Sequence, residues 1–106
     1  MDGSASGELL ATREFDRWLA SLRDDRARGL VARRLAWARS NDYGDCRQVG
    51  EGVIELRIHF GPGYRVYLIR RDQAASILLV GGTKATQRRD IARAVRLAGE
   101  LEGDDR

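Results

Sequence analysis

The chain has 106 residues, a formal net charge of +3, and 42% hydrophobic and 33% charged residues. This length suits one compact domain, so we treat 1–106 as a single domain whose ends, 1–7 and 100–106, are expected to fray. No apolar run reaches the roughly 18–20 residues that span a bilayer, and no basic region followed by an apolar stretch opens the chain. A single cysteine and a single histidine argue against an internal disulfide and a four-ligand zinc site. We therefore expect a cytoplasmic protein with no membrane partner.

Positive charge is concentrated in the second half of the chain. Residues 1–46 carry eight arginines and eight acids, whereas residues 47–99 carry ten basic groups and four acids. The tail at 100–106 has four acids and one arginine. A GC-rich genome would explain the abundance of arginine but not this asymmetry, which is typical of a surface that binds a phosphate-bearing partner.

The first half of the chain predicts a short strand followed by two helices. Residues 7–11 are expected to form the strand, and Thr12 to cap a helix whose apolar residues recur at helical spacing. Asp24 and Asp25 end that helix and favour the start of a second one, which ends at the turn over 40–44. Because each helix has an apolar face, we expect an antiparallel helical hairpin that packs on a sheet.

The second half predicts the sheet and a last helix. Strands are expected over 46–49, 53–60, 64–70 and 75–80. The last of these is apolar throughout, so we place it inside the sheet, with Gly81 and Gly82 ending it. Thr83 or Thr86 is then expected to cap a C-terminal helix. The predicted fold is an α+β two-layer domain, with an N-terminal helical hairpin packed on a mainly antiparallel sheet of four to five strands, followed by the C-terminal helix.

Alternation along two neighbouring strands predicts a cluster of polar side chains on one face of the sheet. Its members are Arg57, His59, Arg65 and Tyr67. Because the helical hairpin needs the opposite face, we expect this face to be open and both guanidiniums to be exposed. Arg47 on the preceding strand and Lys84 after the last strand extend the cluster. Guanidinium groups match phosphate geometry, so the cluster predicts a surface that binds a phosphodiester.

Plainer interpretations stay open for this cluster. His59 and Tyr67 are equally consistent with solvated side chains on a half-exposed sheet. Arg57 is equally consistent with an ion pair to Glu55 or Glu51. Each of these alternatives would give the residue a structural role and no part in binding.

Other conspicuous residues also have plain interpretations. Lys84 is consistent with an ordinary surface lysine in a first helical turn. Trp18 and Trp37 are predicted to pack between helices rather than to stack on bases. Cys46 has no base near it in the predicted arrangement, so the sequence does not indicate a reactive thiol.

Several blocks of sequence resemble the RelE/ParE toxin superfamily, and more narrowly its HigB-like group, the addiction module killer proteins. The first block covers 50–67, with the sequence GEGVIELRIHFGPGYRVY. The second covers 78–84, with the sequence LLVGGTK, and is followed by Gln87 and the DIA at 90–92. The resemblance extends over about residues 8–99. Any one of these blocks alone is weak evidence for the family, but their combination is specific for it.

The resemblance implies the toxin of a bacterial type II toxin–antitoxin module. Its partner would be a helix-turn-helix antitoxin encoded in the same operon, and operator DNA would be bound only through the antitoxin complex. RelE-like members cleave mRNA on the ribosome, by attack of the RNA's own 2′-hydroxyl on the adjacent phosphate, and so inhibit translation. That chemistry implies no metal and no cofactor. The superfamily also contains ParE-like inhibitors of DNA gyrase, and an inactive toxin that only binds its antitoxin is a third interpretation.

The resemblance also implies roles for individual residues. Arg57 and Arg65 would stabilise the phosphate in the transition state, with Lys84 and Arg47 assisting. Proton transfer would fall to the remaining candidates on that face, His59 and Tyr67. The implied RNA-binding set is Arg47, Arg57, Arg65 and Lys84, and the implied catalytic set is Arg57, His59, Arg65, Tyr67 and Lys84.

Overall fold

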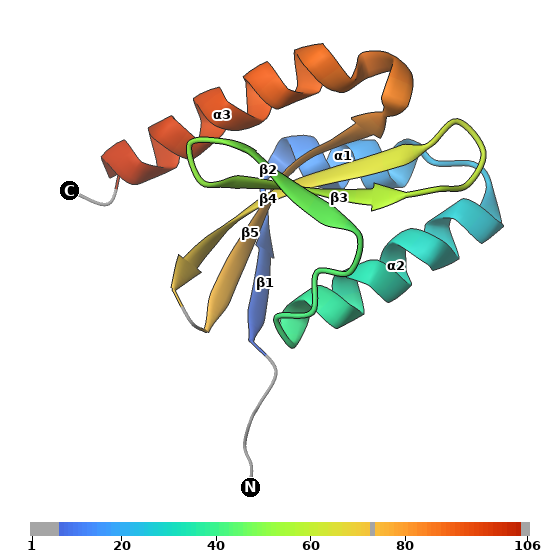
Figure 1. Cartoon of the computed structure of the whole chain (residues 1–106), viewed down its shortest axis with the longest axis horizontal. Helices are drawn as coiled ribbons and strands as arrows, with labels where there is room; N and C mark the ends of the chain where they lie inside the picture. The colour runs from blue at the N-terminus through green and yellow to red at the C-terminus, as the bar shows by residue number, and fades with distance from the viewer. Residues whose placement is uncertain (1–6, 73, 105–106) are drawn as a thin grey trace, which may run out of the picture.

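The computed structural model describes residues 7–72 and 74–104, which form a five-stranded sheet and three α-helices (Figure 1). The strands are β1 (Glu8–Ala11), β2 (Cys46–Gly50), β3 (Val53–Ile58), β4 (Tyr64–Asp72) and β5 (Ala75–Thr83). The helices are α1 (Arg13–Ser21), α2 (Asp25–Arg39) and α3 (Gln87–Asp104), and a 3-10 turn, η1 (Lys84–Thr86), precedes α3. The predicted α+β class with a C-terminal helix is confirmed.

The sheet has the strand order β1-β5-β4-β3-β2. Strand β1 pairs with β5 in parallel, and the three other neighbouring pairs are antiparallel, so the sheet is mixed but mainly antiparallel. Strands β3 and β4 are neighbours because only a short turn joins them. Their register places Arg57 directly opposite Arg65 and Glu55 directly opposite Tyr67.

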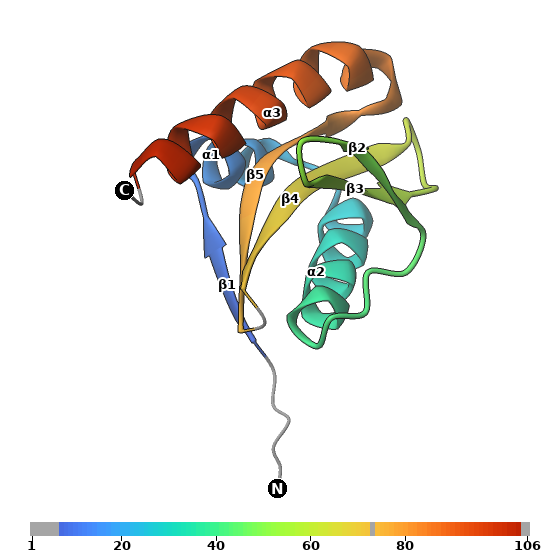
Figure 2. The ribbon, with the colours of Figure 1, turned by 60° about the vertical axis from the view of Figure 1, so that its left-hand side comes forward.

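The two N-terminal helices differ from the expected hairpin. They follow the short strand β1, which forms as predicted, but α1 packs on β5 whereas α2 packs on β3. Both contribute to the same apolar cluster against the sheet, but Figure 2 shows that they do not lie side by side. The predicted cap of α1 forms, since the Thr12 side chain accepts from the Phe15 amide at 3.0 Å. Asp24 accepts from the first amides of α2. Each helix is therefore positioned by its own contact with the sheet.

Helices cover both faces of the sheet, so the expected two-layer arrangement with one open face is wrong. One apolar cluster joins the sheet to α1 and α2, and it includes Phe15, Val31, Leu56, Val66 and Leu68. A second cluster joins the opposite face to α3, and it includes Val53, Tyr67, Leu79, Ala94 and Ala98. The physical reason is that β3, β4 and β5 carry large apolar side chains on this second face too, and α3 buries them.

Strand β5 continues through the two glycines that we expected to end it. A Cβ atom at Gly81 would lie 2.1 Å from the ring of Trp18, and one at Gly82 would lie 1.9 Å from Oδ2 of Asp90. The glycines therefore allow side chains of α1 and α3 to approach the strand closely, and they do not mark a turn. The strand ends at Thr83, whose amide donates to Oγ1 of Thr86 at 3.2 Å.

The two tryptophans lie in different environments. Trp18 packs against Phe15 and Tyr64, with ring centroids 5.6 and 6.5 Å away, so it has a packing role as predicted, but against the sheet and not between helices. Trp37 is 43% exposed, and the guanidinium of Arg34 lies 5.8 Å from its ring centroid. The predicted packing role of Trp37 is therefore wrong.

The ends of the described chain are more ordered than expected. Helix α3 continues to Asp104, so residues 100–104 are helical. The amide of Gly7 donates to the carbonyl of Arg39 at 2.6 Å. The remaining residues that we expected to fray, 1–6 and 105–106, lie outside the described residues.

Among the helices that the structure describes, none combines the length and the apolar character that crossing a membrane requires.

Candidate functional site

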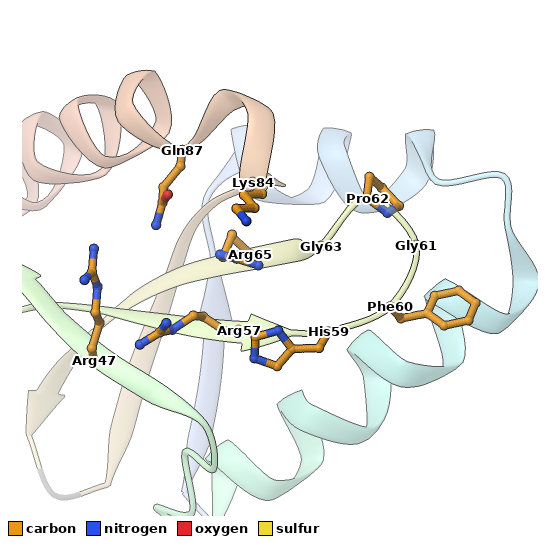
Figure 3. A pocket seen from close by; sticks show the side chains of 10 residues that line it. All are labelled: Arg47, Arg57, His59, Phe60, Gly61, Pro62, Gly63, Arg65, Lys84 and Gln87. Carbon is orange, nitrogen blue, oxygen red and sulfur yellow. The ribbon is translucent and has the colours of Figure 1, made fainter.

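A cleft of about 520 Å³ opens between the β3–β4 hairpin, strand β2 and the start of α3 (Figure 3). Five of the six predicted site residues line it: Arg47, Arg57, His59, Arg65 and Lys84. The sixth, Tyr67, does not. Of the described residues, those that line the cleft include four cations and no carboxylate. The structure thus brings the predicted phosphate-binding residues together.

The β3–β4 hairpin fixes the cationic side chains relative to one another. Its turn is built on Gly61 and Gly63, which both have positive φ angles, and the Gly63 amide donates to the Phe60 carbonyl at 3.0 Å. The Gly63 carbonyl in turn accepts from the amide of Lys84 at 2.8 Å. This bond between hairpin and η1 holds Lys84 beside Arg65, although the two residues are far apart in the sequence.

Arg65 is buried at the floor of the cleft, with only 5% of the residue exposed, so the expectation that it is exposed is wrong. Its guanidinium donates one long hydrogen bond, of 3.3 Å, to the carbonyl of Tyr64, and its Nε has no hydrogen-bond partner. No carboxylate of the described residues forms an ion pair with it. A buried guanidinium with unmet donors is costly unless an anion satisfies it. Arg65 is thus suited to receive an anion that enters the cleft.

Glu55 lies beneath one wall of the cleft and contacts several of the side chains around it. The residue is completely buried, and its Oε2 accepts from the hydroxyl of Tyr67 at 3.0 Å and from Nε2 of Gln87 at 2.8 Å. Its Oε1 lies 3.5 Å from Nε of Arg47 and 3.7 Å from Nε of Arg57. The ion pair between Arg57 and Glu55, which the sequence left open, is confirmed. One buried carboxylate therefore orients two of the cleft's cations.

Tyr67 lies under α3 and not on an open face. It has no exposed surface, and burial together with the neighbouring Glu55 raises its pKa far above the ordinary value for tyrosine. The interpretation of Tyr67 as a solvated side chain is wrong. Its hydroxyl does not reach the cleft, since its hydrogen bond goes to Glu55. Tyr67 consequently acts on the cleft only through the carboxylate that it holds.

His59 sits at the mouth of the cleft and is paired with an acid that the sequence reasoning missed. Its side chain is 67% exposed, and its Nε2 lies 2.5 Å from Oδ2 of Asp45, which immediately precedes β2. This hydrogen bond, and then the charge of Arg57, lowers the pKa of Asp45 below its ordinary value. In Figure 3 the other ring nitrogen of His59 points to the side on which Arg65 lies. The imidazole thus has one nitrogen held and one free toward the cleft.

Arg34 of α2 fixes the loop that carries Asp45. The residue is buried, and its guanidinium donates to the carbonyls of Arg57, Tyr43 and Asp45 at 2.5, 2.6 and 2.9 Å. Gly44, with φ +60°, lets the loop pass close to this guanidinium, because a Cβ there would lie 3.1 Å from it. Sequence reasoning missed Arg34 too. The available signal was its helical spacing from buried Val31, which places it on the inward face of α2.

The fold and the cleft define a small α+β protein whose site is suited to an anion with the geometry of phosphate. In the parts of the chain that the structure describes, no group of three or more His, Cys, Asp or Glu residues gathers in a way that could hold a metal ion. No family model matches the chain. A protein of Haemophilus influenzae (strain Rd), described only as uncharacterized, is 42% identical over 94 residues, which cover 89% of this chain and 95% of that protein. The chain belongs to the same family as that protein.

Proposed function

We propose that this chain is the toxin of a type II toxin–antitoxin module, with the RelE-like arrangement of the RelE/ParE superfamily and its HigB-like group. It acts as a metal-independent endoribonuclease on mRNA in the ribosome and thereby inhibits translation. The sequence blocks at 50–67 and 78–84 support the family, and both border the cleft. The proposal places the protein in the cytoplasm, with a helix-turn-helix antitoxin from the same operon as its partner. Operator DNA is bound only through the complex of the two proteins.

The observation that carries the proposal is the unpaired, buried guanidinium of Arg65 beneath a cleft whose other cations surround it. A buried structural arginine normally has most of its donors satisfied, as Arg34 does by three backbone carbonyls, whereas Arg65 at 5% exposure makes one long hydrogen bond. Glu55 instead pairs with the more exposed Arg47 and Arg57. In the proposal, the phosphodiester of the substrate is the negatively charged partner of the Arg65 guanidinium.

The proposed reaction moves two protons and exchanges one bond at phosphorus. The 2′-oxygen of the RNA attacks the adjacent phosphorus while its proton leaves to a base, and the bond from phosphorus to the 5′-oxygen breaks. The departing oxygen takes up a proton, which gives a 2′,3′-cyclic phosphate and a 5′-hydroxyl. Arg57, Arg65 and Lys84 stabilise the charge that develops on the phosphate oxygens. Arg47 assists in binding the RNA.

His59 is the proton-transfer residue in this proposal. It carries the only imidazole among the described residues that line the cleft, and imidazole is the side chain most often used as a general acid or base. Asp45 holds Nε2, so the nitrogen on the side of Arg65 is free to exchange a proton with a substrate oxygen. Tyr67 has a supporting role only, because it is buried.

Toeprinting in a reconstituted translation system tests the proposal. Wild-type protein should cut mRNA only on ribosomes, and Arg65→Ala should slow cleavage by about 100-fold or more, the usual loss when a group that stabilises the transition-state charge is removed. Arg70→Ala is the matched control, because Arg70 lies on the same strand and is exposed outside the cleft. Intact mRNA in the presence of a protein that still arrests growth would overturn the proposal.

A non-enzymatic inhibitor of DNA gyrase, of the ParE-like kind, is the second candidate. The burial of Tyr67 favours it, because only one proton-transfer residue is then left in the cleft where cleavage needs two protons moved. A supercoiling assay separates the two, since gyrase that works normally in excess protein excludes this candidate. Growth arrest on expression without the antitoxin excludes a third possibility, an inactive toxin that only binds its partner.

A further inference from the structure

A second hollow, of about 260 Å³, adjoins the basic cleft along α2. It shares Arg57, His59 and Phe60 with the cleft, and Trp37 lines it. We propose that this hollow binds the base of the nucleotide next to the phosphate held in the cleft, with Trp37 as the stacking platform. The proposal rests on the proposed function for the identity of the ligand, which is a single-stranded RNA.

The exposure of Trp37 is the first observation behind this proposal. Among the described residues, only Leu10 and Trp37 are large hydrophobic side chains classed as exposed, at 39% and 43%. Arg34 lies over the Trp37 ring at 5.8 Å, within the range of a cation–π contact, so the ring is held in place while much of it faces solvent. A held aromatic ring that is open to solvent can stack on any base, because every base has a π face.

The composition of the hollow favours a nucleic acid over an apolar peptide. Its walls combine Leu30, Ile58 and Phe60 with the arginines Arg33, Arg34 and Arg57. The one acid in the lining, Asp45, is hydrogen-bonded to His59. Aromatic platforms beside a cationic track are the usual design of single-strand binding sites. The volume is also smaller than the roughly 300–1,000 Å³ of sites for drug-sized ligands, which suits one ring system.

Continuity with the cleft is the third observation. A base is tied to its own phosphate through one ribose, so a base site is useful only if it directly adjoins the phosphate site. His59 and Phe60 line both spaces. Figure 3 shows the Phe60 ring pointing away from Arg65 and toward α2, so the residue marks the boundary between the two spaces.

The test uses a 2′-O-methyl trinucleotide, which lacks the attacking hydroxyl and so cannot be cleaved by the proposed reaction. Calorimetric titration gives its affinity for the full chain and for variants. Trp37→Ala should weaken binding about tenfold, and Trp37→Phe should retain most of the affinity because a stacking ring is kept. Leu10→Ala is the matched control, because Leu10 is as exposed as Trp37 but lies on the edge strand β1. It should leave the affinity unchanged.

Three further readouts separate stacking from electrostatic attraction. The first readout compares the intact trinucleotide with one that lacks the base next to the bound phosphate. Wild-type protein should bind the probe without the base about tenfold more weakly than the intact probe, whereas Trp37→Ala should bind the two probes equally well. Trp37→Ala should keep the wild-type salt dependence, whereas Lys84→Ala should lower the slope of log affinity against log salt by about one. The chain has two tryptophans, so Trp37→Phe assigns the indole NMR signal that should shift on titration.

The outcomes distinguish this inference from the function on which it rests. If binding depends on Arg65 and Lys84 but not on Trp37, the base site is overturned and the proposed function stands. If the trinucleotide does not bind, the base site is overturned, and toeprinting decides the function separately. If Trp37-dependent binding is seen without mRNA cleavage, the proposed function fails and the base site stands. If Trp37→Ala instead dissociates a dimer in sedimentation, the hollow is an interface between copies of the chain and the inference is overturned.

Discussion

The hydroxyl of Tyr67 donates a 3.0 Å hydrogen bond to Oε2 of Glu55, and neither side chain has any exposed surface. The two residues are direct partners in the β3–β4 register. Because Glu55 also pairs with Arg47 and Arg57, this bond ties the buried second face of the sheet to the cationic wall of the cleft. Tyr67 thus belongs to the support of the site.

Removing the Tyr67 hydroxyl should cost stability more than activity. Tyr67→Phe leaves a buried carboxylate with one donor fewer, so the free energy of unfolding should fall by about 1–2 kcal/mol in urea denaturation. mRNA cleavage should fall less than tenfold. Tyr43→Phe is the control, because the Tyr43 hydroxyl makes only a 3.4 Å contact with Ser76. Loss of cleavage at unchanged stability would instead assign the Tyr67 hydroxyl a direct part in proton transfer.

Local pattern was enough to predict five of the residues that line the cleft, with Tyr67 as the exception. The alternation along 53–60 and 64–70 and the short turn between them predicted that the two strands pair with Arg57 and Arg65 on one face, and in the structure these two residues lie directly opposite each other. The cap at Thr12 and the helix start at Asp24 and Asp25 were equally local predictions, and both are confirmed. Each of these features depends on residues that are close together in the sequence, which is why the sequence alone predicts them.

Burial could not be predicted in the same way, because it depends on where distant elements dock. Arg65 and Tyr67 were expected to be exposed, but α3 covers that face of the sheet. Asp45 and Arg34 become part of the site only through the packing of α2 against β3. The helical spacing of Arg34 from Val31 indicates an inward-facing side chain, but it does not indicate which strand or loop that side chain contacts. Trp37 was expected to be packed because tryptophan is a large apolar residue, but its side chain lies on the exposed part of α2.

Replacing Arg65 with an uncharged side chain of similar length should stabilise the protein while abolishing its proposed activity. Arg65→Met removes a buried cation with unmet donors, so the free energy of unfolding should rise by about 1–2 kcal/mol. Arg70 is an exposed arginine of the same strand, so Arg70→Met should change the free energy of unfolding by less than about 0.5 kcal/mol. Chemical denaturation measures both. A marked loss of stability in Arg65→Met would show that Arg65 has a structural partner and would remove the argument for an anion site.

The pairing of Asp45 with His59 predicts a pH dependence at the acidic end. The pKa of Asp45 is lowered below 3.8, first by the hydrogen bond from His59 and then by the charge of Arg57. Because the folded-state pKa is the lower one, the carboxylate stabilises the fold above pH about 4, and this contribution is lost as the pH falls through the folded-state pKa. Carboxyl NMR titration of Asp45 should give a value below 3.8 that rises in His59→Ala, and rises less in Arg57→Ala. An unchanged pKa of Asp45 in His59→Ala would contradict the pairing in solution.

The close contact between Gly82 and Asp90 predicts opposite effects for two glycine substitutions near α3. A Cβ at Gly82 would lie 1.9 Å from Oδ2 of Asp90, a buried carboxylate that also accepts from Oγ1 of Thr86 at 2.5 Å. Gly82→Ala should therefore push the first turn of α3 away from β5 and lower the free energy of unfolding by about 1–3 kcal/mol.

Gly99→Ala is the matched control for this substitution. Gly99 lies within α3 and has no atom within 4 Å of an added Cβ, so the change should stabilise the protein by about 0.5–1 kcal/mol through helix propensity alone. Thermal and urea denaturation of both variants measure the difference. The first turn of α3 adjoins Lys84 and carries Gln87, so Gly82→Ala should also disturb the cleft and reduce mRNA cleavage, while Gly99→Ala should leave it unchanged. Equal stability of the two variants would mean that β5 and α3 are not in contact at this point in solution.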